Sequence, residues 1–324
     1  MCVVELPWYE RGVLVVNSSQ TTHPNLYRLI DIISNQNPLQ RKRIEAFLSD
    51  RDDAYWDFSE SLSRTLNEHL LGSPESAEEA ARSYNRMCMD FLKEQIRFKK
   101  TGKYLISDSA VANEEVYSKP EVMRYYMIGL LLSYMFWPNH YAILRFLDGH
   151  LKGRTIKHYL EIAPGHGLFT THAIRHSPGL EATLVDISPT SIEVSKSILE
   201  AFGVDVRKLR FQQGDFLKVE HDTSGFDFIS MGEVLEHVNE AGAFLARAAG
   251  LLLREGVMFM TTCANCPALD HVYHFRNIRE IRALIASADL VIVDEMAVPS
   301  DRVPEADWES ELVTINYSCI LKRA

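Results

Sequence analysis

A glycine turn between two short apolar segments limits what this chain can fold into more than any other feature. The apolar segment His158–Ile162 runs into Ala163-Pro-Gly-His-Gly167, and a second apolar segment, Ala182–Asp186, follows after a helical stretch. The two glycines let the backbone approach a ligand where a Cβ atom would collide, and the next helix directs free N–H groups into the same crevice. Asp186 lies 21 residues after Gly165, about the distance expected for an acid that binds ribose hydroxyls.

Length and charge narrow the class of protein. The 324 residues suffice for one large α/β domain with an accessory part, or for two domains. A formal charge of −10 argues against an extended nucleic-acid surface, which needs a basic face. The basic side chains of Lys93, Arg97, Lys99, Lys100 and Lys103 are expected to form a solvated helix end. We therefore expect no nucleic-acid partner.

The apolar runs and the cysteines favour a cytoplasmic protein without a membrane anchor. The first residues show no basic stretch followed by an apolar segment and cleavage site, so no signal peptide is expected. The longest apolar run, Tyr126–Trp137, is too short for a bilayer of about 30 Å. Five cysteines fit a reducing compartment. Cys263-Ala-Asn-Cys266 has no second pair and no thioredoxin-like context, so neither redox nor zinc chemistry is expected there.

Helical periodicity dominates the first part of the chain, which we predict to be a helical cap, residues 1–150. The apolar run Gly12–Val16 is expected to form a strand or an arm. Further on, Ser73 is expected to cap and Pro74 to begin a long helix that reaches about Lys100.

A strongly aromatic helix lies just before the glycine turn. Ser118-Lys-Pro-Glu121 has the spacing of a capping box at its start, and Pro138 is expected to kink or break it. Most of its aromatic side chains are expected to join helices to the sheet. Asn139, His140 and Tyr141 are polar groups at the expected break, so at least one should contact a ligand.

From about Thr155 the chain alternates between strands and helices and forms the second predicted domain, residues 151–324. The expected strands are His158–Ile162, Ala182–Asp186, Leu209–Gln213, Phe226–Met231, Val257–Thr262, Leu290–Val298 and Val313–Leu321. The expected helices lie near Gly167–Ser177, Pro189–Phe202, Ala241–Arg254 and Ile278–Ala288. Successive βα units predict an α/β fold, a doubly wound seven-stranded sheet with its site at the carboxyl ends of the strands. The last two strands have no helix between them, so an antiparallel last strand is expected.

Over residues 155–324 this arrangement resembles the class I S-adenosylmethionine-dependent methyltransferases, whose core is Rossmann-like. Glu161-Ile-Ala-Pro-Gly-His-Gly167 is similar to the family's first motif, Glu-x-Gly-x-Gly-x-Gly, with Ala163 in place of the first glycine. Gly214-Asp-Phe216 is similar to the segment that binds adenine, and Ser230–His237 resembles the fourth motif of the ubiquinone-biosynthesis type. The resemblance implies S-adenosyl-L-methionine as cofactor and the following binding residues: Glu161, Ala163, Gly165, Gly167, Asp186, Ile187, Asp215, Phe216 and Glu233.

A nicotinamide cofactor is the competing interpretation of the glycine turn. That cofactor predicts a Gly-x-Gly-x-x-Gly turn that cradles phosphates. This chain has Phe169 and Thr170 where the third glycine belongs. Adenosylmethionine carries no phosphate that would need it.

The resemblance also suggests which side chains act on the acceptor. Methyl transfer requires orientation, exclusion of water and, for an alcohol or amine, removal of a proton. His237 follows the fourth strand and could act as the base near neutral pH, although it could instead bond backbone at a helix start. We predict His237, Asn139 and Tyr141 as catalytic residues.

A divalent cation stays open as an alternative, although no metal ligand is included among the predicted site residues. Glu233, Glu236 and His237 occupy positions i, i+3 and i+4, which share one face if the segment is helical. His271 or His274 could complete a metal site, contact the substrate, or order the loop after the fifth strand.

The sequence therefore predicts a cytoplasmic methyltransferase that acts on an oxygen or nitrogen of a small molecule in a specialised-metabolite pathway. One alternative keeps the cofactor and changes the chemistry: bacterial azetidine-2-carboxylate synthases cyclise adenosylmethionine and release methylthioadenosine. Another is a non-catalytic adenosylmethionine-binding subunit. The long N-terminal helices could also mediate homodimerisation.

Overall fold

The computed structural model of the chain describes residues 22–68, 76–221, 225–301 and 303–324. Two expectations lie outside these residues: the strand or arm at Gly12–Val16, and the helix start at Ser73 and Pro74. None of the described helices combines the length and the apolarity that crossing a bilayer requires.

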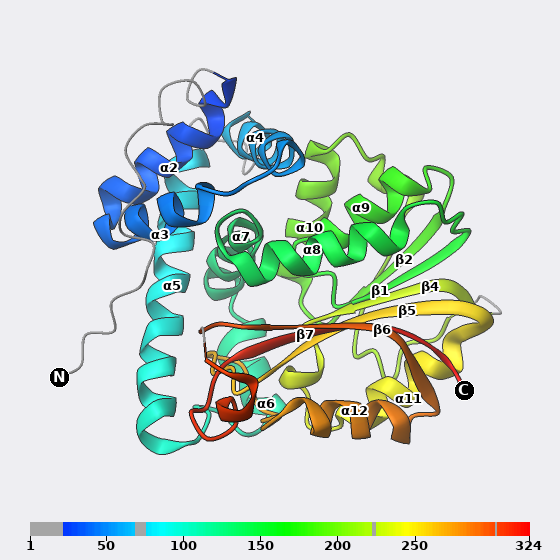
Figure 1. The fold of residues 1–324 in the computed structure, drawn as a ribbon. Coiled ribbons are helices and arrows are strands. Elements are labelled where there is room, and N and C mark those ends of the chain that lie inside the picture. Colours follow the sequence, from blue (N-terminus) through cyan, green and yellow to red (C-terminus); the bar gives the residue numbers. More distant parts are fainter. Residues whose placement is uncertain (1–21, 69–75, 222–224, 302) are drawn as a thin grey trace.

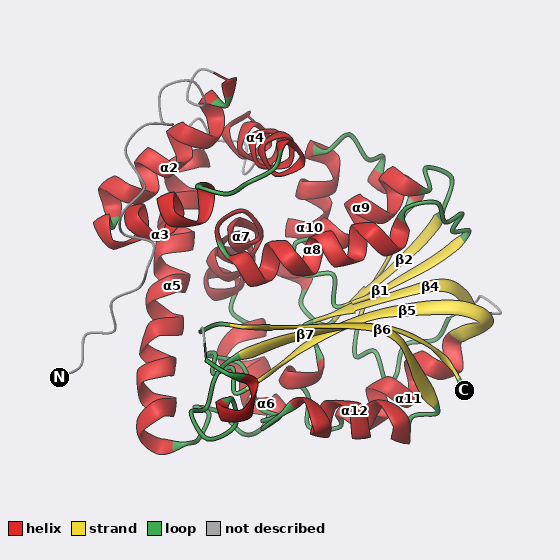
Figure 2. Cartoon of the chain, viewed as in Figure 1, coloured by secondary structure: helices red, strands yellow, loops and turns green. Residues whose placement is uncertain are grey.

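A seven-stranded sheet forms the centre of the molecule, with the strand order β3-β2-β1-β4-β5-β7-β6 (Figures 1 and 2). The strands are β1 (His158–Ile162), β2 (Glu181–Asp186), β3 (Arg210–Gln213), β4 (Phe226–Gly232), β5 (Leu252–Ala264), β6 (Leu290–Pro299) and β7 (Ile315–Arg323). The first five strands pair in parallel, and β7 pairs antiparallel with both β5 and β6. The predicted fold class, including the antiparallel last strand, is confirmed.

Helices cover both faces of the sheet (Figure 1). One face packs against α8 (Pro138–Leu151), α9 (Leu168–His176) and α10 (Pro189–Ala201), and the other against α11 (Ala241–Leu251) and α12 (Ile278–Ser287). Successive side chains of β1 point to opposite faces of the sheet, because side chains alternate along a strand with a period of two residues. Tyr159 belongs to the first hydrophobic cluster, and Leu160 to the second.

The remaining helices stand beside the carboxyl edge of the sheet (Figure 1). They are α2 (Pro24–Gln36), α3 (Pro38–Leu48), α4 (Asp53–Glu68), α5 (Ser76–Thr101), α6 (Ser109–Ala112), the π-helical turn η2 (Asn113–Tyr117) and α7 (Pro120–Phe136). Twelve of the 17 residues of α7 are buried, since this helix lies between α5 and the core and contacts both α5 and α10.

Two prolines set the ends of α7, one as expected and one differently. The break at Pro138 is confirmed: α7 ends at Phe136, Trp137 is extended, and α8 begins at Pro138. The capping box at Ser118 is wrong, because Lys119 is the residue before the helix and makes no side-chain capping bond. The residue before a proline is disfavoured in the helical region, so Pro120 fixes the helix start one residue later than expected.

The boundary between α11 and β5 also differs from expectation, and β7 lies two residues later than the predicted Val313–Leu321. The expected helix Ala241–Arg254 ends at Leu251, because Leu252 already pairs with Phe226 in the sheet. Strand β5 is correspondingly longer at its start than the predicted Val257–Thr262.

Candidate active site

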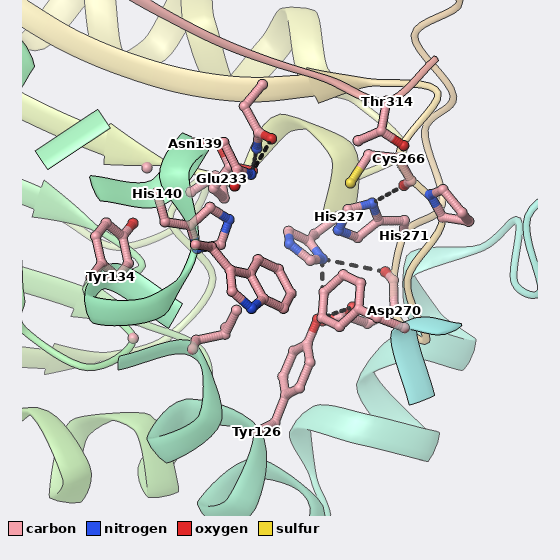
Figure 3. A pocket seen from close by; sticks show the side chains of 18 of the residues that line it. Tyr126, Tyr134, Asn139, His140, Glu233, His237, Cys266, Asp270, His271 and Thr314 are labelled. Atoms are coloured by element: carbon pink, nitrogen blue, oxygen red, sulfur yellow. Dashed lines mark hydrogen bonds and ion pairs between the residues drawn. The ribbon is translucent and has the colours of Figure 1, made fainter. Parts of the chain in front are cut away.

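A cavity of about 2490 Å³ opens at the carboxyl ends of β1, β2 and β4 (Figure 3). Its walls come from the sheet, from the loops that follow the strands, and from α5, α7 and α8. Sites for a single small ligand usually measure about 300–1,000 Å³. The cavity therefore has room for a cofactor and for a second molecule beside it.

The glycine turn after β1 has the left-handed backbone that its sequence predicts. The φ angles are 53° at Ala163, 56° at Gly165 and 73° at Gly167. A left-handed conformation costs a residue with a Cβ roughly 1–2 kcal/mol, so Ala163 holds the turn under strain. The turn is fixed from outside by Ser195, whose hydroxyl donates to the Gly165 carbonyl at 2.8 Å.

Two buried carboxyl groups flank this turn. Asp186, at the end of β2, accepts from the Ser188 backbone N–H at 2.8 Å, and burial raises the pKa of Asp186 to about 6. Glu161 accepts hydrogen bonds from the hydroxyls of Tyr159 and Thr170, and burial raises its pKa to about 7. Both carboxyl groups line the cavity.

The residues predicted to bind adenine also line the cavity. Ile187, also among the predicted cofactor-binding residues, follows Asp186 and is 46% exposed. After β3, Asp215 accepts from the Leu217 backbone N–H at 3.0 Å. Phe216 is buried and packs against Phe244 with ring centroids 5.5 Å apart. These positions offer the acid and the apolar surfaces that a purine requires.

Glu233, just after β4, is linked through Asn316 of β7 to Asn139 at the start of α8. Its Oε2 accepts from the Asn316 amide at 3.4 Å, and Asn316 Oδ1 accepts from the Asn139 amide at 2.6 Å. Glu233 Oε1 is buried and has no hydrogen-bond partner among the described residues. Burial raises the pKa of this carboxyl. Asn316 was not among the predicted site residues.

His237 lies across the cavity, where its Nδ1 atom faces acceptors (Figure 3). Nδ1 is 2.9 Å from the Tyr117 hydroxyl oxygen and 3.3 Å from both the carbonyl oxygen and Oδ2 of Asp270. These neighbours place the ring proton on Nδ1, so the lone pair is on Nε2. Figure 3 shows that second nitrogen turned toward the side where Glu233 and Asn139 lie.

Asp270 is the site residue that sequence reasoning missed on this side. It is almost fully buried, and its carboxylate accepts from the Tyr117 and Tyr126 hydroxyls at 3.2 and 3.1 Å. Burial raises the pKa of both tyrosines well above the usual range, so they remain neutral donors. An acid directly before His271, in the loop after the fifth strand, was the available signal.

Comparison with known proteins gives matches that include the segment with the glycine turn and the strands after it. A family model described as "Methyltransferase domain" matches residues 160–258. A ubiquinone biosynthesis O-methyltransferase of Bartonella quintana is 27% identical over 183 residues, which cover 51% of this chain and 72% of that protein. A protein of the same name from Coxiella burnetii is 31% identical over 112 residues, 35% of this chain and 44% of its own length.

Among solved structures, the mitomycin 7-O-methyltransferase MmcR is similar over 94% of this chain and 95% of its own, with 14% identity and a TM-score of 0.49. The matched family model, the strand order of the sheet and the residues at the motif positions all point to the same class of protein. The chain has a class I S-adenosylmethionine-dependent methyltransferase core. Its cofactor is S-adenosyl-L-methionine.

The residues of this methyltransferase fit that cofactor. Gly165 and Asp186 line the cavity. Gly167 is not among the described lining residues: a Cβ there would meet Ser195 of α10, so this glycine serves the packing of the turn. The unpartnered Glu233 Oε1 can accept from the cofactor's ammonium group. Glu161, Ala163, Ile187, Asp215 and Phe216 share the same wall, and their individual roles remain proposals.

The three predicted catalytic residues of the methyltransferase are not all at the cavity. His237 and Asn139 line it. Tyr141 is not among its described lining residues: its ring packs against Phe47 and Tyr55, and its hydroxyl lies 3.4 Å from Asp52. Tyr141 stabilises the helical region and is not part of the catalytic set that we propose.

The expected common face of Glu233, Glu236 and His237 is absent from the structure. Only Leu235–His237 form a helical turn, and Glu233 has a φ of 52°. Glu236 points inward and accepts from the Thr262 hydroxyl at 2.7 Å. The potential ligand atoms of Glu236, His237 and His271 nevertheless lie within 4.8 Å of one another.

His274 does not join that group. Its Nε2 lies 2.8 Å from Asn265 Oδ1, and it is not among the described residues that line the cavity. Ordering of the loop is the role that this contact supports for His274.

Proposed function

We propose that this methyltransferase transfers a methyl group to a hydroxyl oxygen of a small molecule, with His237 as the general base. The observation that carries the proposal is the pairing of His237 Nδ1 with buried Asp270, which leaves Nε2 free on the cavity side. A base positioned in this way typically accelerates a reaction by about 10²- to 10⁴-fold.

When bound, adenosylmethionine supplies a methyl group that its sulfonium already activates. The chain's own residues orient both molecules and move one proton. His237 Nε2 accepts the acceptor's hydroxyl proton, and the Asp270 carboxylate stabilises the resulting imidazolium. Tyr117 and Tyr126 hold Asp270 in place through their hydroxyls.

The methionine end of the cofactor is proposed to lie between Glu233 and Asn139 on one side and the His237–Asp270 pair on the other. Glu233 and Asn139 bind that end from the sheet and from the start of α8. The aromatic rings of Phe91 and Trp137, whose centroids are 5.4 Å apart, form part of the cavity wall and exclude water from the reacting atoms.

Oxygen rather than nitrogen is favoured because a hydroxyl oxygen becomes a strong nucleophile only as it loses its proton, which the His237–Asp270 pair accepts, whereas a neutral amine can attack before it loses its proton. The relatives from Bartonella quintana and Coxiella burnetii are also O-methyltransferases by name. The cavity of about 2490 Å³ has room for a small-molecule acceptor beside the cofactor. We propose a specialised metabolite as that acceptor.

The test is product analysis by mass spectrometry with purified protein, adenosylmethionine and a panel of phenols, alcohols and matched amines. We expect adenosylhomocysteine to form only when a hydroxylated acceptor is present, in amounts equal to the methylated product. His237→Gln serves as the matched control and should bind the cofactor without turnover.

Two other outcomes would contradict the proposal. Methylthioadenosine formed from adenosylmethionine alone would identify a cyclase of the cofactor. Cofactor binding without turnover across the panel, together with co-purification of a catalytic partner, would identify a regulatory subunit.

A further inference from the structure

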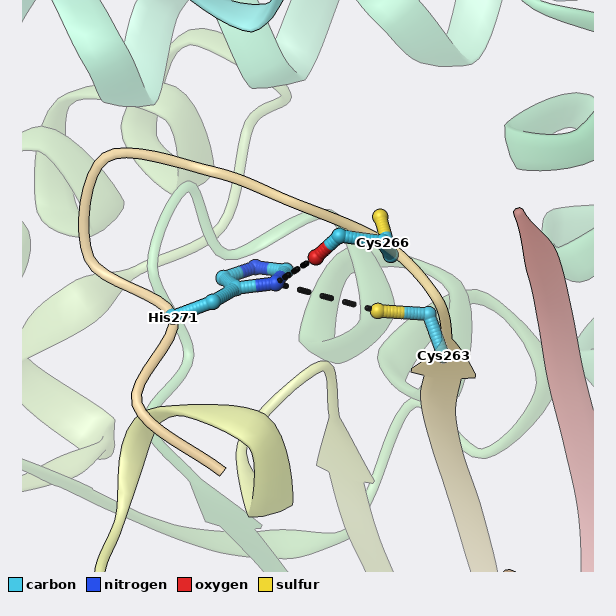
Figure 4. Close-up of side chains that lie close together, drawn as sticks. All are labelled: Cys263, Cys266 and His271. Atoms are coloured by element: carbon cyan, nitrogen blue, oxygen red, sulfur yellow. Dashed lines mark hydrogen bonds between the residues drawn. The ribbon is translucent and has the colours of Figure 1, made fainter. Parts of the chain in front are cut away.

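Three potential metal ligands meet at the end of β5, next to the acceptor side of the cavity (Figure 4). Cys263 is the penultimate residue of the strand, Cys266 follows in the loop, and His271 approaches from further along the same loop. Cys263 and His271 are buried, whereas Cys266 is half-buried. The sequence showed a cysteine pair without partners, and the fold supplies the third group.

The separations within this cluster suit one small ion. One ligand atom from each of the three residues lies within 4.8 Å of the others. Cys263 Sγ is 3.7 Å from Glu236 Oε1 and 3.9 Å from His271 Nδ1. That nitrogen lies 2.6 Å from the Cys266 carbonyl oxygen, a hydrogen bond that the ion would have to replace. With bonds of about 2.3 Å to sulfur and about 2.0–2.1 Å to nitrogen, tetrahedral zinc separates neighbouring donors by roughly 3.5 Å. Small side-chain rotations would bring these ligand atoms from their present separations to the separations found around zinc.

We propose that Cys263, Cys266 and His271 hold a divalent ion of zinc type, with the Glu236 carboxylate as fourth ligand. Two thiolates and an imidazole select a borderline-soft ion over magnesium or calcium, which take oxygen ligands. A Cys-x₂-Cys pair on one turn is a usual half of such a site.

The surrounding contacts prepare Glu236 for this role. The Thr262 hydroxyl donates to Glu236 Oε2, which leaves Oε1 on the side of Cys263. The ligand atoms of Glu233, Glu236 and Cys263 also lie within 4.8 Å of one another. Acidic groups this close repel when ionised, and a divalent cation would offset that repulsion as its binding releases the thiol protons.

The alternative set of Glu236, His237 and His271 is less suited to the ion. His237 Nδ1 already faces Tyr117 and Asp270, and its Nε2 lone pair cannot serve both a metal and a hydroxyl proton. The cysteine set leaves His237 available, although the His237 and His271 rings lie only 4.6 Å apart.

An ion here would fix the wall of the acceptor pocket. The loop between β5 and α12 carries Asp270, and the backbone N–H groups of Val272 and Tyr273 already donate to the Glu236 carbonyl. Linking Cys263 and Cys266 to His271 would close this loop around Asp270. The proposed site is therefore structural, and it positions the His237–Asp270 pair.

The test is metal binding by the full chain, purified without an affinity tag and kept reduced. We expect about one equivalent of zinc per chain by elemental mass spectrometry, and thiolate-to-cobalt charge-transfer absorption when Co²⁺ replaces it. Cys266→Ser and His271→Ala should each weaken Co²⁺ binding by at least about 10- to 100-fold, the loss seen when groups that only orient a ligand are removed. Cys88→Ser and His274→Ala are the matched controls and should keep the absorption.

Three results would overturn the proposal. The first is a folded, reduced wild-type chain that neither retains zinc nor shows cobalt–thiolate absorption. The second is a His271→Ala variant that binds Co²⁺ as tightly as the wild type. The third is an intact mass showing that Cys263 and Cys266 form a disulfide, with no metal bound after reduction.

Discussion

The proton on His237 Nδ1 determines what the other ring nitrogen can do. Asp270 and Tyr117 surround Nδ1, and Asp270 is in turn held by Tyr126. At the scale of single residues, the proposed chemistry therefore depends on one imidazole and on the buried acid behind it.

Removing the base should separate catalysis from binding. We expect His237→Ala to lower kcat by about 10²- to 10⁴-fold while the Kd for adenosylmethionine is nearly unchanged. Asp270→Asn should lower kcat as well, since it disturbs the tautomer of His237. Steady-state kinetics and calorimetry on the same preparations measure both quantities. Full activity of His237→Ala would remove the base assignment.

The raised pKa values of two carboxyl groups predict that the stabilisation of the protein by its cofactor depends on pH. Glu161 and Asp186 have pKa values of about 7 and about 6, above their ordinary 4.5 and 3.8. The free folded protein thus holds protons that the unfolded chain has lost, so this contribution to stability declines as the pH rises through about 6 and about 7. A bound cofactor favours the ionised carboxylates, through hydrogen bonds from its ribose hydroxyls and through its positive charge, and opposes this trend.

The increase in Tm caused by adenosylmethionine should therefore grow between acidic and neutral pH. Adenosylhomocysteine, which lacks the sulfonium charge, should show a weaker dependence, and Glu161→Gln should flatten it. Thermal denaturation across the pH range measures the effect. An equal increase in Tm at every pH would refute the assignment of these carboxyls to the cofactor.

At the scale of elements, the end of β4 is packed too tightly for a larger residue. A Cβ atom at Gly232 would collide with the Phe169 ring, and Phe169 itself packs against Tyr134 and Phe259 with ring centroids 5.7 and 5.4 Å apart. This contact places Glu233, the next residue, at the cavity wall.

Gly232→Ala should therefore destabilise the protein by about 1–3 kcal/mol, as overpacking does. Gly149→Ala is the control, because a Cβ at this exposed helical position meets nothing within 4 Å. That change should stabilise the protein by roughly 0.5–1 kcal/mol. Chemical denaturation of both variants gives the two values, and equal stabilities would contradict the packing argument.

The elements of the core could be predicted because their causes are local. Strands buried on both faces give continuous apolar runs such as Val257–Met260, and the glycine turn requires left-handed residues at fixed positions. The start of α7 was placed incorrectly because the proline outweighed the serine as a start signal. Local rules thus gave most of the fold and the cofactor wall.

The acceptor side could not be predicted in the same way, because long-range pairing assembles it. Asn139 meets Asn316, 177 residues later, only through the placement of α8 against β7. Cys263 and Cys266 gain a third partner when the loop after β5 folds back and brings His271 to them. Neither juxtaposition leaves a spacing signal in the sequence.

At the scale of the whole molecule, one hydrophobic cluster crosses the proposed boundary between residues 1–150 and 151–324. It includes Leu29 of α2, Leu131 of α7 and Phe228 of β4. The helices therefore complete the core of the sheet as well as one wall of the cavity.

We expect the full chain to unfold in a single cooperative transition. A fragment of residues 155–324 should lack that transition or aggregate, because it exposes the apolar face that α7 and α8 cover. Differential scanning calorimetry of both proteins is the measurement. Two separate transitions in the full chain, with the second reproduced by the fragment, would show that the halves fold independently.

Calorimetric titration with adenosylmethionine tests the central claim, that the turn after β1 and the acid after β2 bind this cofactor. The wild type should show saturable binding at one site per chain. Asp186→Ala, with an unchanged circular dichroism spectrum, should bind far more weakly. A folded wild type without saturable heat, or an Asp186→Ala variant with undiminished affinity, would contradict the account.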